Sequence, residues 1–369
     1  MQFSISMNKR GTLVKKAVIF LLLICLGVGI FACGNSKVKT DSGEEKVATV
    51  NKRIVVGFSQ LGAESDWRSA NTDSMKETFT LENGYDFIFE DGQQKQSNQI
   101  TAIRMFIQQE VDYIVLAPVT ETGWDTVLQE AKDAGIPVII VDRMVDVSDE
   151  SLFTCWVGSD FELEGKKIAE WLNEYIVLNK MEPSELNIVN IQGTIGASAQ
   201  IGRTKGLSDA SKKYGWNLLE ERTGDFTQAK GEEVMKDFLK KYDNINVVYC
   251  ENDNQAFGAI EAIEEAGLKV GSDIADGEIM VLSFDGVNEN SLRYVMEDRI
   301  TCIAECNPLH GPRVMSMIEK LENGEVPEKF SYVDEQLFSA YKEIKTISVD
   351  GKKYPVTMVT PDMVVVNEK

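Results

Sequence analysis

The chain has 369 residues, of which 59 are acidic and 38 basic, so its formal net charge is −21 at pH 7. This acidity argues against nucleic acid as a partner, because phosphate-binding proteins carry dense clusters of Lys and Arg. The chain holds one histidine and no Cys-x-x-Cys motif, so we predict no zinc or transition-metal site and no cofactor.

Residues 1–32 have the pattern of an export signal. Four basic residues precede an apolar run over 17–32, which is shorter than the run of about 20 residues that a membrane helix needs. Because Ala32 stands before Cys33 as in bacterial lipoprotein signals, we expect cleavage there and a lipid on the Cys33 thiol. Removing residues 1–32, which hold four basic and no acidic residues, changes the net charge from −21 to −25. An ordinary secretory signal with an incidental cysteine, or a retained membrane anchor, is the alternative.

The stretch after Cys33 is rich in Ser, Lys, Glu, Asp and Thr and has no apolar period. Such a composition cannot bury a core and is typical of a solvated linker. We therefore expect residues 33–52 to tether a folded domain to the cell membrane on its extracytoplasmic side.

From Arg53 onward, short β-branched runs alternate with longer amphipathic stretches, which predicts βαβ units and an α/β fold with parallel sheets. Helices are predicted over 95–109 and 122–134, where apolar residues recur on one face. The mature chain is too long for one core, so two similar units in tandem are expected. The predicted strands cover 54–58, 85–90, 113–117 and 137–142 in the first unit, and 186–192, 216–222, 246–250 and 278–284 in the second.

Outside the signal and Cys33, four cysteines remain: Cys155, Cys250, Cys302 and Cys306. The last two stand four residues apart in a predicted strand, roughly 13 Å, which exceeds the reach of a disulfide. We predict buried free thiols.

Polar and aromatic residues gather just after the predicted strands, where open α/β sheets bind ligands. Asp, Asn and Arg side chains satisfy neighbouring sugar hydroxyls, which both donate and accept, and aromatic rings cover the C–H faces. The pattern therefore predicts a sugar site. These residues are 59–68, Asp91, Pro118, Val119, Asp142 and Arg143 in the first unit, and 193–198, Asp225, Phe226, Asn252, Asp253, Asp285 and Gly286 in the second.

Some of these residues have a purely structural alternative. The alternative for Trp67 is a core residue at a helix start, and the alternative for Asp142 with Arg143 is a local ion pair or turn. His310, between Pro308 and Gly311, is best explained as a structural residue near a helix start.

Helix capping is the alternative for two acidic residues of the second unit. Asp253 is favoured as the N-cap of a helix over 254–266, which leaves Asn252 as the ligand contact. Asp225 is a candidate cap for a helix beginning at Thr227, whereas Phe226 is unusual in a loop unless something stacks on it.

Sequence motifs for catalysis are missing at the strand ends. The glycine-rich residues 193–198 match neither the P-loop nor Gly-x-Gly-x-x-Gly, so a tight strand-to-helix turn is expected there. No Gly-x-Ser-x-Gly motif is present. The strand-end carboxylates could form a glycosidase pair, but their spacing does not select one.

Taken in order, the strand-end motifs resemble those of the type I periplasmic sugar-binding proteins of ABC transporters, the superfamily of ribose- and galactose-binding receptors. The likeness is greatest to its galactofuranose-binding members and spans about residues 53–330. It is carried by residues 56–60, 64–68, 91–96, 117–118, 142–143, 191–194, 196–198, 224–227, 252–253 and 285–287.

The resemblance implies two doubly wound parallel-sheet lobes joined by a three-segment hinge, which close on a sugar. The implied lobes are 53–157 with 306–328 and 160–304 with 329–340, followed by an extension over 341–369 with a candidate strand near 364–366. The implied ligand-binding residues are Trp67, Arg68, Asp91, Asp142 and Arg143 in the first lobe, Arg203, Phe226, Asn252 and Asp285 in the second, and Glu305 at the hinge.

The function implied is capture of a monosaccharide, galactofuranose- or galactose-like as a first expectation, and its delivery to an ABC permease without catalysis. A sugar-sensing receptor that docks on a signalling protein is the first rival, and a glycosidase or sugar-converting enzyme is the second. Transcription regulators share this fold but begin with a helix-turn-helix module, whereas this chain begins with an export signal.

Overall fold

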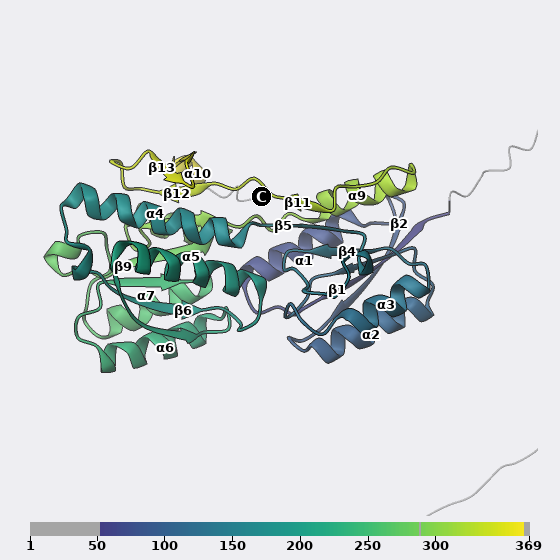
Figure 1. The fold of residues 1–369 in the computed structure, drawn as a ribbon, viewed down its shortest axis with the longest axis horizontal. Helices are drawn as coiled ribbons and strands as arrows, with labels where there is room; N and C mark the ends of the chain where they lie inside the picture. Colours follow the sequence, from purple (N-terminus) through teal and green to yellow (C-terminus); the bar gives the residue numbers. More distant parts are fainter. Residues whose placement is uncertain (1–51, 288, 365–369) are drawn as a thin grey trace, which may run out of the picture. The chain divides into compact units, whose positions relative to one another are not determined.

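A computed structural model describes residues 52–287 and 289–364. The predicted signal, Cys33 and almost all of the linker lie outside this part of the chain. Within it, no helix combines the length and the apolar character that crossing a membrane requires. The described chain forms two large, mainly parallel sheets with helices on both faces of each, and a separate two-stranded sheet (Figure 1).

The first sheet has the strand order β11-β5-β4-β3-β1-β2, and all of its pairs are parallel. Its two faces are buried in separate clusters, since Ile114 and Leu116 pack with helices α2 and α3, while Tyr113 and Val115 pack with α1 and α9. The strands are β1 (Ile54–Gln60), β2 (Tyr85–Asp91), β3 (Tyr113–Leu116), β4 (Val138–Val141), β5 (Cys155–Gly158) and β11 (Phe330–Tyr332), and the helices are α1 (Asp66–Thr78), α2 (Gln96–Gln108), α3 (Asp125–Asp133) and α9 (Gly311–Glu322).

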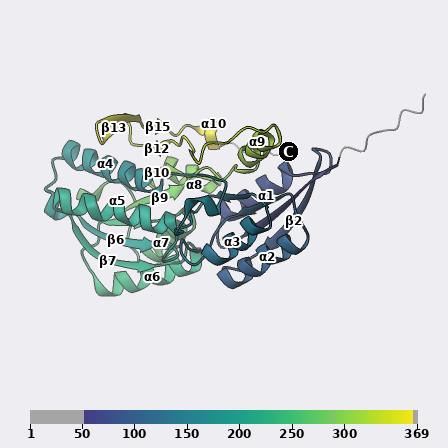
Figure 2. The ribbon, with the colours of Figure 1, turned by 45° about the vertical axis from the view of Figure 1, so that its right-hand side comes forward.

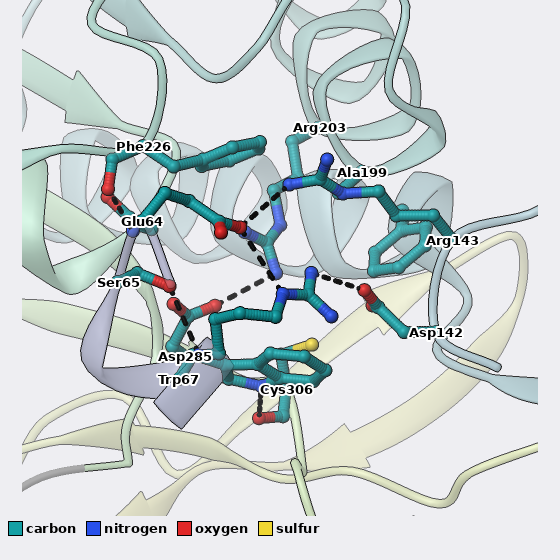
Figure 3. Close-up of a pocket in the computed structure, with 13 residues that line it drawn as sticks. Glu64, Ser65, Trp67, Asp142, Arg143, Ala199, Arg203, Phe226, Asp285 and Cys306 are labelled. Carbon is teal, nitrogen blue, oxygen red and sulfur yellow. Dashed lines mark hydrogen bonds and ion pairs between the residues drawn. The ribbon is translucent and has the colours of Figure 1, made fainter. Parts of the chain in front are cut away.

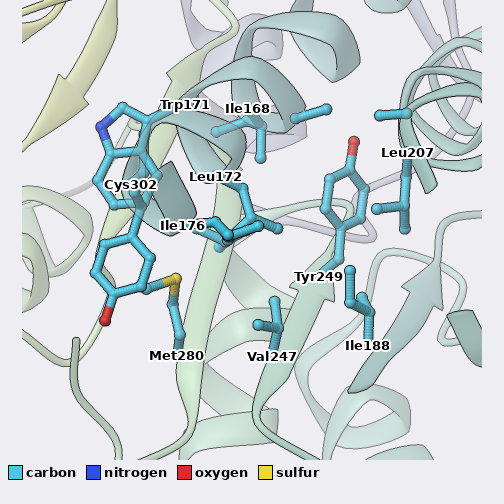
Figure 4. Packing of buried hydrophobic residues seen from close by; sticks show 14 of the residues in the cluster. Ile168, Trp171, Leu172, Ile176, Ile188, Leu207, Val247, Tyr249, Met280 and Cys302 are labelled. Carbon is cyan, nitrogen blue, oxygen red and sulfur yellow. The ribbon is translucent and has the colours of Figure 1, made fainter. Parts of the chain in front are cut away.

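The second sheet has the order β15-β12-β10-β9-β8-β6-β7, with one antiparallel pair, β10 with β12. Val247 and Tyr249 of β8 pack against α4 and α5 (Figure 4), whereas Val248 and Cys250 face α6 and α7. The strands are β6 (Asn187–Gln192), β7 (Asn217–Thr223), β8 (Val247–Cys250), β9 (Met280–Asp285), β10 (Cys302–Glu305), β12 (Leu337–Ser339) and β15 (Thr357–Met358), and the helices are α4 (Phe161–Asn179), α5 (Ser198–Tyr214), α6 (Gln228–Lys241), α7 (Asp253–Glu265) and α8 (Glu289–Met296).

The chain passes between the two sheets three times, after β5, after β10 and after β11 (Figures 1 and 2). The molecule therefore consists of two doubly wound lobes joined by a three-segment hinge, as expected. One predicted boundary differs from the strand pairing. Residues 329–340 were expected in the second lobe, but Phe330–Tyr332 pairs with β5 in the first sheet, and only β12 belongs to the second.

The C-terminal residues add a hairpin, β13 (Thr346–Val349) with β14 (Lys352–Pro355), which packs on α4 through Ile347 and Val349. The candidate strand near 364–366 is wrong at its first residue, because Pro361–Val364 forms helix α10. Proline at the first helical position and an acid in the first turn favour that helix start. Residues 365–366 lie outside the described chain.

The four predicted free cysteines are indeed unpaired and buried. Three short 3₁₀ turns complete the described elements: η1 (Glu150–Leu152), η2 (Pro183–Glu185) and η3 (Ile274–Asp276).

Candidate functional site

A cavity of about 280 Å³ lies between the two lobes at the carboxyl ends of the strands (Figure 3). It brings together all of the predicted ligand-binding residues except Asp91 and Glu305. Its lining residues are Glu64, Ser65, Trp67, Arg68, Asp142, Arg143 and Phe161, with Ala199, Arg203, Phe226, Asn252, Asp285 and Cys306.

The first lobe contributes a buried network of four charged side chains. Arg68 donates from Nη2 to Asp142 Oδ2 at 2.6 Å and from Nε to Glu64 Oε1 at 3.3 Å. Arg143 donates to the same Glu64 oxygen at 3.2 Å and to the Val119 carbonyl at 3.0 Å. Because all four side chains are at most 4% exposed, the two acids and two bases neutralise one another in a dry setting.

These contacts set the ionisation of the network. Burial disfavours the Asp142 carboxylate, but the nearby Arg68 and Arg143 outweigh it and lower the pKa of Asp142. Burial and the like charge of Arg68 lower the pKa of Arg143 to about 10, against the opposite effect of Glu64. Asp142 and the two arginines therefore remain charged at neutral pH.

Two atoms of this network are left without partners in the described part of the chain. Glu64 Oε2 and Arg68 Nη1 are fully buried and form no hydrogen bond there. One is an acceptor and the other a donor, and an unsatisfied buried polar atom costs roughly 1–3 kcal/mol. Such a pair is suited to a ligand group that both donates and accepts.

The second lobe contributes one guanidinium to the cavity lining, that of Arg203 on α5. It donates from Nε to Glu164 Oε2 at 2.7 Å and from Nη2 to Asp285 Oδ1 at 3.2 Å, and Nη1 donates to the Glu251 carbonyl. Burial raises the pKa of Asp285 well above its usual range, although Arg203 opposes this. Arg203 is thus held at three points and presents a fixed face to the cavity.

Two aromatic rings lie on opposite sides of the charged groups in Figure 3, Trp67 from α1 and Phe226 from the loop after β7. Trp67 Nε1 donates to the Cys306 carbonyl at 2.7 Å, which fixes the ring. The Arg143 guanidinium carbon lies 5.1 Å from the Phe226 ring centroid. Trp67 therefore belongs to a buried cluster and also lines the cavity, while its contact with a ligand stays a prediction.

The position of Phe226 depends on Gly193. A Cβ on Gly193 would lie 1.9 Å from Phe226 Cζ, so only glycine fits there. Phe226 itself has φ +62°, a left-handed conformation that is rare for a bulky residue. Asp142 and Asp285 also have positive φ, +61° and +95°. Backbone strain of this kind gathers at functional sites.

Asn252 lies in the cavity wall as predicted, but the predicted capping role of Asp253 is wrong. Asn252 is the N-cap of α7, because its extended backbone lets Oδ1 accept from the Gln255 N–H at 2.9 Å. Asp253 is the first helical residue, and its carboxylate accepts instead from the hydroxyls of Ser283 and Ser291.

The predicted cap at Asp225 is also wrong. Thr227 caps α6 by accepting from the Lys230 N–H, while the Asp225 carboxylate pairs with the Lys230 ammonium. By contrast, residues 193–198 form the expected turn between β6 and α5, and His310 is buried at the start of α9, where it contacts Asn71.

Asp91 and Glu305 lie outside the cavity. Asp91 is exposed at the end of β2 and accepts from the Gln93 N–H of its own loop. Glu305 is turned toward the hinge, where it accepts from the Gln336 N–H at 2.9 Å and from the Asn307 side chain. The fold therefore does not bring Asp91 or Glu305 to the predicted residues that line the cavity.

Five lining residues were not among the ten implied ligand-binding residues: Glu64 and Ser65, which lie in the strand-end stretch 59–68 from which a sugar site was predicted, and Phe161, Ala199 and Cys306. Glu64 had a detectable signal, because it stands four residues before Arg68, a spacing that allows an ion pair. Phe161 and Ala199 of the second lobe and Cys306 of the hinge reach the cavity only because the second lobe packs against the first.

Direct contacts join the lobes at the rim of the cavity. The Asp66 N–H donates to Asn254 Oδ1 at 3.0 Å, and the Met144 N–H donates to Ser198 Oγ at 2.9 Å. These bonds between opposite lobes mean that the structure is in a closed conformation.

One group of described residues brings possible metal-ligand atoms together: Glu164, Cys306 and Glu335 offer one atom each, all within 4.8 Å of one another. The Glu164 carboxylate already pairs with Arg203, and the Lys167 ammonium is bonded to the Glu335 carbonyl. These two cations disfavour a divalent cation among these groups.

Comparison with known proteins identifies a family and several relatives of this chain. Residues 56–311 match a family model described as a periplasmic binding protein domain. The galactofuranose-binding protein YtfQ of Escherichia coli (strain K12) is 42% identical over 290 residues, which are 77% of this chain and 87% of that protein.

Two solved structures are similarly close. A Mycobacterium smegmatis protein in complex with β-D-fucofuranose is 39% identical, with a TM-score of 0.72 over 78% of this chain and 91% of the other. The periplasmic binding protein component of the arabinose ABC transporter from Shewanella sp. ANA-3, bound to α- and β-L-arabinofuranose, is 40% identical, with a TM-score of 0.71 over 77% of this chain and 91% of the other.

Proposed function

The chain belongs to the periplasmic binding protein domain family, and from that premise we propose that it captures one monosaccharide in the cleft between its lobes and delivers it to an ABC-type permease. A galactofuranose- or galactose-like sugar is the first candidate. The observation that carries the proposal is that two residues lining the cavity each have a buried atom without a partner in the described chain, the acceptor Glu64 Oε2 and the donor Arg68 Nη1, and that two aromatic rings line the same cavity.

A sugar hydroxyl matches these atoms because it donates and accepts at once. The rings of Trp67 and Phe226 provide flat apolar surfaces for the C–H faces of a sugar.

The charge of the cavity supports a neutral sugar over an acidic one. Arg68, Arg143 and Arg203 each already pair with a carboxylate of the wall, namely Glu64, Asp142, Asp285 or the adjoining Glu164. A uronic acid or sugar phosphate would place a further anion beside these carboxylates without a free guanidinium to receive it. We therefore expect both to be rejected.

The furanose ring form is supported by the relatives alone. The three proteins compared above are named for or bound to galactofuranose, fucofuranose and arabinofuranose. We extend this preference to the present chain as a proposal. Because these relatives are ligand-binding proteins, the same comparison favours a receptor over a glycosidase or sugar-converting enzyme.

Anchoring and delivery rest on the sequence and the family. The pattern around Cys33 supports a lipid anchor, and the arabinose-binding relative is a component of an ABC transporter. Docking on a signalling protein is the alternative, and it would use the same closed form.

Calorimetric titration of the chain from Asn51 onward, which forms one compact unit, tests the proposal. The panel should hold D-galactose, D-fucose, L-arabinose and D-ribose, with D-galacturonate and galactose 1-phosphate as charged controls. Binding of a neutral sugar that is recovered unchanged is the expected result. Recovery of a converted product would establish an enzyme, and binding of only the charged compounds would overturn the assignment of the cavity.

A further inference from the structure

One carboxyl group, that of Glu335, joins the three hinge segments. Its Oε1 accepts from Ser159 Oγ at 2.6 Å and from the Asn307 N–H at 2.7 Å. Ser159 lies on the first crossing between lobes, Asn307 on the second, and Glu335 on the third. Opening the lobes changes the backbone angles of such hinge residues, so this three-way contact depends on closure.

The Glu335 carboxylate forms no ion pair among residues 52–287 and 289–364. The adjacent Lys167 donates to the Glu335 backbone carbonyl at 2.7 Å, so its ammonium is directed at the main chain. Glu164, which is also close, is bonded to Arg203 through Oε2, and apart from the nearby Cys306 thiol its buried Oε1 has no donor in the described chain. Two buried carboxyl groups therefore share a region with one guanidinium.

Protonation of Glu335 removes the repulsion between its carboxylate and that of Glu164. Burial and the nearby Glu164 raise the pKa of Glu335 to about 9. A protonated carboxyl group also supplies a donor within 4.8 Å of the Glu164 oxygens and the Cys306 thiol. The charged and titratable groups around Glu335 are Asp160, Glu164 and Lys167 of α4 and its cap, Glu305, Cys306, Arg313, the neighbouring Asp334, and Lys352 and Tyr354 of the hairpin.

The hinge cluster is connected to the ligand cavity at two points. Glu164 holds Nε of Arg203, a cavity residue, and the Cys306 carbonyl accepts from the Trp67 indole. A second negative charge next to Glu164 would compete for Arg203 and loosen it. The protonation of Glu335 thus bears on the geometry of the cavity without any contact between Glu335 and a ligand.

We propose that the lobes close with Glu335 protonated and open with it ionised, so that sugar capture takes up one proton at the hinge. This rests on the proposed sugar-binding function. The sign follows from linkage: a carboxyl group that binds its proton more tightly in the closed form favours closure at low pH, and affinity falls as pH rises toward about 9. Glu335 is a positioning residue, because it acts on the cavity through Glu164 and Arg203 and does not contact the sugar.

The test compares Glu335→Gln with the wild-type chain. Glutamine has the shape of the protonated acid, with an amide oxygen to accept from Ser159 and Asn307 and an amide nitrogen to donate toward Glu164. Titration with D-galactose in buffers of different ionisation enthalpy counts the protons taken up on binding. We expect about one more proton for wild type than for Glu335→Gln, and a wild-type affinity that falls by up to about tenfold per pH unit above neutrality. The matched control is Asp334→Asn, an exposed acid one residue away, which should behave as wild type.

Equal proton uptake by wild type and Glu335→Gln would overturn the proposal, since other buried acids such as Asp285 would then be the source. Affinity that depends on added zinc or on a chelator would replace it with a metal site. Difference infrared spectra between about pH 6 and pH 10, recorded on a chain locked in the closed conformation by a disulfide between Asp66→Cys and Asn254→Cys across the rim contact, provide a readout that needs no sugar. A protonated-carboxyl band present in the wild type and lost in Glu335→Gln is expected, so failure of D-galactose to bind would count against the sugar assignment alone.

Discussion

Replacement of Arg143 by alanine is the most direct test of the cavity. It removes the bond to the Val119 carbonyl at 3.0 Å, the pairing with Glu64 at 3.2 Å and the contact with the Phe226 ring at 5.1 Å. Glu64 then retains only Arg68, at 3.3 Å.

The unpaired Glu64 lowers the stability of the variant with and without sugar, whereas the binding free energy loses the proposed hydrogen bond from the charged Arg143 to a sugar hydroxyl, about 1.5–3 kcal/mol. Converted at about 1.4 kcal/mol per factor of ten, sugar affinity should fall by about 10-fold to about 100-fold. Arg143→Lys keeps the positive charge but not the planar guanidinium. Its sugar affinity should therefore lie between that of wild type and that of Arg143→Ala.

Calorimetry on the soluble chain measures the loss, and a thermal melt without sugar shows whether the variant is folded. Arg104→Ala is the matched control, because Arg104 forms an exposed pair with Glu130 on the outer helices of the same lobe. An Arg143→Ala variant with wild-type affinity and a normal melt would remove Arg143 from the site and refute the cavity assignment.

Three further outcomes are expected. Trp67→Ala should weaken binding at least tenfold and lower the melting temperature, whereas Trp67→Phe, which keeps a ring, should bind better than alanine in the same titration. Gly193→Ala should displace the Phe226 ring and weaken binding, and adding Phe226→Ala should relieve the loss of stability but not of affinity. Cys33→Ser should release the full-length protein from membranes in a pelleting assay, whereas Cys25→Ser should not; a Cys33→Ser protein that still pellets would argue against lipidation.

Most of the sheet could be predicted because local composition dominates there. The β-branched runs before Ser59, Pro118 and Asp142 each form a strand within a few residues of the predicted bounds. The family expected from the motifs at these strand ends is confirmed by the match over residues 56–311.

The third hinge crossing was predicted, but its position was misplaced for a physical reason. The strand Phe330–Tyr332 has only three residues, and its place in the first sheet comes from pairing with Cys155–Gly158, far away in sequence. Short strands carry too little periodicity to be assigned to a sheet, so the predicted boundary at residue 329 lay on the wrong side of the crossing.

The exchange of roles between Asn252 and Asp253 reflects the near-equal capping ability of the two side chains. The choice is made by partners remote in sequence: Ser283 and Ser291 occupy the Asp253 carboxylate and leave the cap to Asn252. Asp91 illustrates the opposite error. It ends a strand as the other site residues do, but β2 is the edge strand of its sheet and lies away from the second lobe.

The arrangement of charges explains how a cleft rich in ions can select a neutral ligand. Arg68, Arg143 and Arg203 are fixed by carboxylates in the closed structure, so they need no reorganisation when a sugar arrives. The affinity then depends on the few polar atoms that the protein leaves unsatisfied. A sugar that lacks the matching hydroxyl leaves each such atom unpaired at a cost of roughly 1–3 kcal/mol, and selectivity among sugars of similar size follows from this penalty.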